Sequence, residues 1–95
     1  MQIVWTKQAE AELRSAVRYA RGRWPVAAEQ IASHMLASVA RLGQFPELGR
    51  PGAVGRTRGL VLTRYPLTIV YAPGAEAVTV LRVFHQRQKW PTSPC

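Results

Sequence analysis

The side chains best suited to chemistry in this sequence are one histidine, one glutamate and two arginines in its second half. His85 has an ordinary pKa near about 6.5, so it can act as a general base or a general acid around neutrality. Glu47 can accept a proton, and Arg64 and Arg82 can stabilise negative charge on a phosphate. These four side chains are the candidate catalytic set for acid–base chemistry at a phosphate group. The alternative for His85 is a structural role at the end of a strand.

Further arginines cluster in and just after a segment rich in glycine and proline, residues 45–56. A basic loop with glycines can approach a phosphate closely, because glycine leaves room for backbone contact. The alternative is that these cations are simply solvated. The candidate set for binding a target or a nucleic acid is Arg50, Arg56, Arg58, Arg82 and Arg87.

The composition favours a negatively charged partner. The 95 residues include 13 Lys and Arg against 5 acidic residues, which gives a formal net charge of +8. Most of these cations are arginines, which form bidentate contacts with phosphates and carboxylates. We therefore expect a polyanion or an acidic protein as partner, with solubility alone as the alternative. One cysteine, Cys95, and two histidines are too few for a typical zinc site, so we expect no metal and no cofactor.

Two helices are predicted in the first half, after a short strand at residues 2–5. Thr6 is a suitable N-cap for a helix over residues 7 to about 24. Its apolar residues recur every three or four positions on one face, and Glu12 belongs to the polar face together with the arginines. Pro25 fits the first turn of a second helix that runs to residue 42. The short break between the helices predicts an antiparallel hairpin.

The second half changes to a strand pattern. Residues 45–56 are predicted as a loop, and residues 57–63, 67–71 and 78–84 as the three strands of an antiparallel meander, with residues 85–95 as a C-terminal tail. We therefore predict one α+β domain over residues 1–95, with the order β-α-α-β-β-β. The helical hairpin should pack on one face of a mainly antiparallel sheet. No apolar run approaches the roughly twenty residues that span a bilayer, so we expect a cytoplasmic location and no membrane partner.

Four segments of the chain carry a family likeness. The first is the start of the first helix, with Trp5, Ala9, Leu13 and Tyr19. Residues 45–52, FPELGRPG, are similar to the pattern FPxxGRPG, and residues 57–61 read TRGLV. Residues 81–91, LRVFHQRQKWP, are similar to LRVxHxRQxWP. In this order the segments resemble the RelE/ParE superfamily of toxins from type II toxin–antitoxin systems, and its ParE-like branch most.

The resemblance implies a growth-arresting toxin that a cognate antitoxin neutralises. The antitoxin is expected to be an acidic, partly disordered chain that forms a hetero-oligomer with this one. We expect it to cover the apolar stripe left exposed by the two helices. The expected antitoxin contacts are Trp5, Leu13, Val17, Arg14, Arg18 and Arg21. For the three arginines, contact with DNA or RNA and a simply solvated helix face are the alternatives.

The resemblance implies two classes of target, because one fold serves both. ParE-like relatives poison DNA gyrase, and this is the function we expect. The alternative is a ribosome-dependent mRNA endoribonuclease, in which the candidate catalytic set would act. The chain departs from that branch, since it has only two lysines and no tyrosine after Tyr71. Whether the chain is an enzyme is therefore left open, and a second alternative is a non-toxic member that only binds antitoxin.

Overall fold

The computed structural model describes residues 1–23, 25–52, 55–62 and 67–85, without the side chains of residues 25, 27 and 85. Its elements confirm the predicted order and the α+β class, with one added strand. They are β1 (Gln2–Trp5), α1 (Lys7–Arg23), α2 (Pro25–Leu42), β2 (Arg50–Pro51), β3 (Arg58–Val61), β4 (Leu67–Pro73) and β5 (Ala77–His85).

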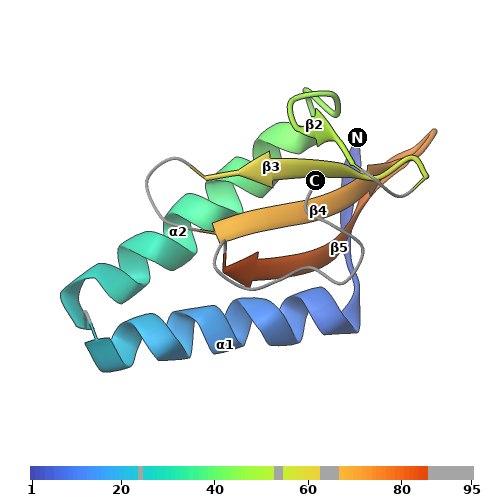
Figure 1. Cartoon of the computed structure of the whole chain (residues 1–95). Helices are drawn as coiled ribbons and strands as arrows, with labels where there is room; N and C mark the ends of the chain where they lie inside the picture. The colour runs from blue at the N-terminus through green and yellow to red at the C-terminus, as the bar shows by residue number, and fades with distance from the viewer. Residues whose placement is uncertain (24, 53–54, 63–66, 86–95) are drawn as a thin grey trace.

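The strands form one sheet in the order β1-β5-β4-β3-β2 (Figure 1). The predicted meander of β3, β4 and β5 is antiparallel, whereas β1 pairs in parallel with β5, from Gln2 opposite Ala77 to Trp5 opposite Val80. The start of the chain thus pairs with β5, the last described strand. This parallel pairing makes the sheet mixed.

The segment predicted as a loop at residues 45–56 contains the short strand β2. Arg50 pairs with Gly59 and Pro51 pairs with Arg58, both antiparallel. A proline is tolerated here because β2 is an edge strand, whose outer side needs no N–H donor. The expectation of an unpaired loop was therefore wrong at these two residues. Strand β5 extends to His85, which was expected to begin the tail.

Where β1 ends, the start of α1 continues along the same edge of β5. The Thr6 N–H donates to the Val80 carbonyl at 3.1 Å, and the Thr6 hydroxyl donates to the Leu81 carbonyl at 3.2 Å. The same hydroxyl oxygen accepts the Ala9 N–H at 3.0 Å, which confirms Thr6 as the N-cap. Thr6 therefore fixes both the start of α1 and its position against the sheet.

The helical hairpin and the sheet share one apolar core. Helices α1 and α2 are separated by residue 24 alone, as the position of Pro25 predicted. Both helices lie against the sheet, with α1 running alongside β5 (Figure 1). The buried residues of this cluster are Ala9, Ala20, Ala28, Ile31, Met35, Val39, Leu62, Leu67, Ile69, Val80 and Val83. The apolar stripes of both helices thus face the chain's own sheet.

Candidate functional site

The glycine- and proline-rich segment is held in place by a buried tyrosine from β4. The Tyr71 hydroxyl donates to the Pro46 carbonyl at 2.8 Å and accepts the Gly49 N–H at 2.8 Å. Burial raises the pKa of Tyr71 above its ordinary value of 10.0, which favours the protonated hydroxyl that this donor role needs. Tyr71 was not predicted to have a role, because nothing in the sequence connects it with a loop more than twenty residues earlier.

Gly49 allows this close contact. A Cβ atom at this position would lie 2.8 Å from the Gly59 carbonyl oxygen and 2.9 Å from the ring and hydroxyl of Tyr71. Any larger residue would push the segment away from β3 and β4. The glycine is therefore explained by packing against the sheet and not by approach to a phosphate.

Arg58 also serves this segment. Its Nη1 donates to the Gly49 carbonyl at 2.7 Å and to the Glu47 carbonyl at 3.3 Å. Its Nη2 lies 4.0 Å from Oε1 of Glu47, whose side chain is 83% exposed, so this ion pair is loose. The guanidinium proposed for target binding is thus engaged with backbone carbonyls of its own chain.

Arg82 forms a close ion pair with Glu12 of α1. Its Nη2 lies 2.7 Å from Oε2 of Glu12, and its Nε donates to both carboxylate oxygens at 2.8 and 3.0 Å. The same carboxylate accepts the Val83 N–H at 2.8 Å, on the part of β5 that β1 does not reach. Glu12 was expected on the solvent face of α1, and this was wrong, because the helix lies along the edge of β5. An arginine within an apolar strand was the available signal that a counter-ion was needed.

The sheet register separates the two strand arginines. Arg58 lies opposite Tyr71, whereas Arg82 lies opposite Val70, the neighbouring residue of β4. The β4–β5 pairing shifts register between Val70 and Tyr71, so the core contacts decide the faces. Val83, next to Arg82, belongs to the main core cluster, whereas Leu60, two residues after Arg58, packs against that cluster. Successive residues of a strand point to opposite faces, and alternate residues share a face. Arg58 and Arg82 therefore belong to opposite faces of the sheet and do not converge on one reaction centre.

Of the remaining predicted site residues, the structure describes Arg50 and Arg56 in full and only the backbone of His85. Arg50 and Arg56 are exposed, and Arg50 lies on the edge strand β2. The backbone of His85 ends β5 opposite Leu67, and its side chain lies outside the described residues. Arg64 and Arg87 also lie outside the described residues. Of the candidate catalytic set, the described side chains are those of Glu47 and Arg82, which lie in separate hydrogen-bonded clusters.

The stripe assigned to an antitoxin is not left exposed. Trp5 and Leu13 are partly buried and pack against the main core cluster, and Val17 is half-buried. This corrects the expectation of an open apolar face on α1, because the sheet covers it. The three arginines of the same set, Arg14, Arg18 and Arg21, are exposed.

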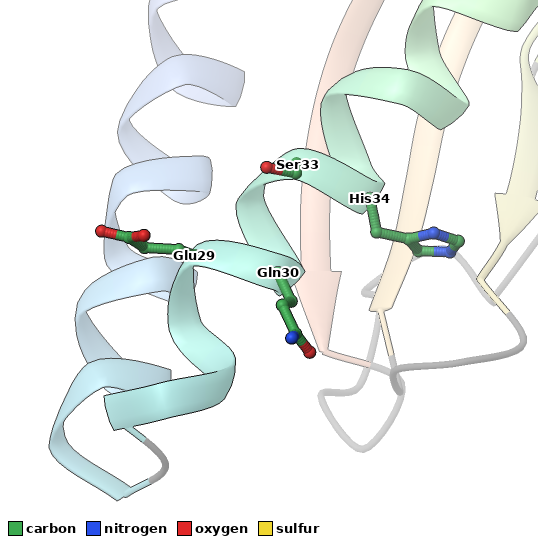
Figure 2. A pocket seen from close by; sticks show the side chains of 4 residues that line it. All are labelled: Glu29, Gln30, Ser33 and His34. Carbon is green, nitrogen blue, oxygen red and sulfur yellow. The ribbon is translucent and has the colours of Figure 1, made fainter.

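A shallow hollow on α2 does not form a reaction site. It has a volume of about 580 Å³ and is lined by Glu29, Gln30, Ser33 and His34. Figure 2 shows these side chains pointing in different directions from the helix, with Glu29 and His34 on opposite sides. Across the described ranges, no three His, Cys, Asp or Glu side chains gather closely enough to hold a metal ion. No described helix has the length and apolar character to cross a membrane.

Comparison with known proteins gives the family. Residues 3–90 match the profile of the ParE toxin of the type II toxin–antitoxin system parDE. The chain belongs to the ParE toxin family. A curated relative from Sinorhizobium fredii, named "Putative toxin Y4kP", is 34% identical over 90 residues, which cover 95% of this chain and 93% of that protein.

A solved structure confirms the fold of this ParE-family chain. The chromosomal ParDE toxin–antitoxin system from P. aeruginosa matches with a TM-score of 0.80 and 24% identity, over 90% of this chain and 95% of the other. The predicted family and fold class are therefore both confirmed, and the protein is a toxin of a type II toxin–antitoxin system.

Proposed function

We propose that this ParE-family toxin arrests bacterial growth in the cytoplasm by poisoning DNA gyrase. The observation that carries the proposal is the match to the ParE toxin family over residues 3–90. The geometry supports a protein-binding poison over a nuclease in the part of the chain that the structure describes. Arg58 holds a loop, Arg82 pairs with Glu12, and the two lie on opposite faces of the sheet.

The neutralising partner in this proposal is a cognate antitoxin in a hetero-oligomer with the toxin. The similar P. aeruginosa structure is that of a ParDE toxin–antitoxin system, which supports a partner of this class. The net charge of +8 attracts an acidic chain. Since the helical stripes are covered by the sheet, the antitoxin would bind apolar side chains that are exposed, such as Tyr19 and Leu36 on the helices, at 52% and 51%.

The test uses purified gyrase, relaxed plasmid and the purified toxin. We expect lost supercoiling or the accumulation of cleaved DNA, with both effects removed when the antitoxin is added first. The same toxin preparation is added to a translation extract with a reporter mRNA, which should remain intact. Unaffected gyrase together with cut mRNA would overturn the proposal in favour of a ribosome-dependent endoribonuclease. Survival of cells under strong expression of a folded toxin would contradict growth arrest itself.

A further inference from the structure

The outward side of α1 carries a row of four cations. Lys7, Arg14, Arg18 and Arg21 are all exposed. At 100° per residue they fall within about 60° of the helix circumference, and at 1.5 Å per residue the row is about 21 Å long. The buried residues of this helix, Ala9 and Ala20, lie on the opposite side. The row is therefore a straight, rigid line of positive charge turned away from the core.

These cations have no structural use that the described residues reveal. In the described part of the chain, none of the four side chains forms a hydrogen bond or an ion pair. Lys7 is the first residue of α1, where the positive end of the helix dipole disfavours a cation. Arg58 and Arg82 show the contrast, because both are engaged within the chain. Four aligned and unpaired cations point to a partner outside the chain.

The surroundings of the row suit a phosphate backbone better than a peptide. Beside the cations lie the small, exposed residues Ala11, Ser15 and Gly22, which allow close approach of a rigid polyanion. A binding peptide segment needs apolar anchors in pockets, and the row provides none. The exposed aromatic residue of this helix, Tyr19, lies outside the row. The guanidinium carbon of Arg23 lies 4.9 Å from the centroid of its ring. Bases of a single strand thus find no stacking platform among the four cations.

We propose that the row of Lys7, Arg14, Arg18 and Arg21 binds the phosphates of duplex DNA without reading its sequence. Ammonium and guanidinium groups only donate hydrogen bonds, so they bind phosphate oxygens and carry no information on base sequence. Glu10 is exposed at the border of the row and lowers its net charge. The choice of DNA over RNA rests on the proposed gyrase target, since that enzyme holds DNA. The inference otherwise goes beyond it, because it assigns a nucleic-acid contact to the toxin itself.

The experiment measures the binding of the whole chain to a labelled 20-base-pair duplex of mixed sequence by fluorescence anisotropy, without gyrase. If each cation of the row neutralises one phosphate, log K falls against log salt with a slope of about −3.6, which is roughly a 150-fold loss of affinity between 50 and 200 mM salt. In the triple variant Arg14→Gln, Arg18→Gln and Arg21→Gln, the slope should become shallower, at about −0.9. The loss of affinity between 50 and 200 mM salt should then be roughly 4-fold. Glutamine keeps a helix propensity close to that of arginine, and circular dichroism checks the fold.

Matched single variants distinguish the row from diffuse charge. Arg18→Gln should reduce the size of the slope by about 0.9, whereas Arg41→Gln, which removes an exposed cation from the end of α2, should leave it unchanged. Glu10→Gln should tighten binding, which gives a test by gain that unfolding cannot mimic.

Equal effects of Arg18→Gln and Arg41→Gln would overturn the proposal, as would a salt slope near zero. Displacement of the DNA by polyglutamate at equal charge concentration would assign the row to an acidic protein instead. Tighter binding of an RNA duplex of the same length would overturn the choice of DNA. Because gyrase is absent from this experiment, a failure of DNA binding leaves the gyrase proposal standing. If the toxin has no effect on gyrase, phosphate binding by the row still stands, and the DNA and RNA duplexes then decide the ligand by direct comparison.

Discussion

Replacing Tyr71 by phenylalanine removes the hydroxyl that holds the segment at residues 45–52. The buried Gly49 N–H then loses its acceptor and the Pro46 carbonyl loses its donor, both at 2.8 Å. A buried polar group left without a partner costs about 1–3 kcal/mol, and the carbonyl is partly accessible to water, so we expect a loss of about 2–3 kcal/mol. For a chain of this size that lowers Tm by roughly 10–20 °C.

Urea unfolding followed by circular dichroism measures this loss as a lower midpoint at an unchanged m-value. Tyr19→Phe is the matched control, because its ring is 52% exposed, and it should change stability by less than about 0.5 kcal/mol. A Tyr71→Phe variant as stable as the native chain would refute the reasoning that the hydroxyl holds the loop.

The same residue gives a pH dependence with a definite sign. The folded state raises the pKa of Tyr71 above the 10.0 of the unfolded chain, because burial disfavours the phenolate. Above about pH 10 the unfolded chain therefore binds fewer protons than the folded one, and stability falls as the pH rises. The loss from Tyr71 is absent in Tyr71→Phe, so the stability difference between the two proteins should shrink above pH 10. A difference that is constant from pH 8 to pH 11 would contradict this.

The remaining predictions also concern stability. Gly49→Ala should cost about 1–3 kcal/mol, because the added Cβ would lie 2.8 Å from a backbone carbonyl, whereas Gly22→Ala in α1 meets no atom within 4 Å and should stabilise by about 0.5–1 kcal/mol. Thermal unfolding of the two variants checks the opposite signs, and equal shifts would contradict the packing argument. Glu12→Gln should cost about 1–3 kcal/mol, because Arg82 loses the negative charge that it pairs with. Glu12→Ala should cost more, because the Val83 N–H also loses its acceptor. Urea midpoints in the reverse order would refute this assignment.

Local patterns predicted most of the elements. Both helices and the three-stranded meander follow from periodicity, and Thr6 and Pro25 act where their chemistry indicated. The parallel partner of β1 could not be predicted, because a four-residue strand carries no signal for direction or neighbour. The two residues of β2 were missed for a related reason, since a strand this short depends on the tertiary contact with β3.

The candidate site was predicted less well, because side-chain contacts depend on register. The sequence could not show that Arg58 of β3 and Arg82 of β5 lie opposite neighbouring residues of β4, on opposite faces of the sheet. It also placed Glu12 with the solvent face of its helix, since periodicity alone does not say that the helix runs along a strand edge. Family likeness therefore carried the functional prediction, and the geometry decided which arginines are engaged within the chain.

This division of the arginines determines how loss-of-toxicity variants must be read. Arg82 holds Glu12, and Glu12 in turn holds the edge of β5. An inactive Arg82→Ala protein is therefore expected from lost structure alone, and by itself it gives no support to a catalytic arginine. Glu12→Gln separates the two explanations, because it weakens the same ion pair and leaves the guanidinium in place. If toxicity falls in parallel with stability in both variants, Arg82 acts through the fold. If Glu12→Gln stays toxic at a stability where Arg82→Ala is inactive, the guanidinium itself contacts the target.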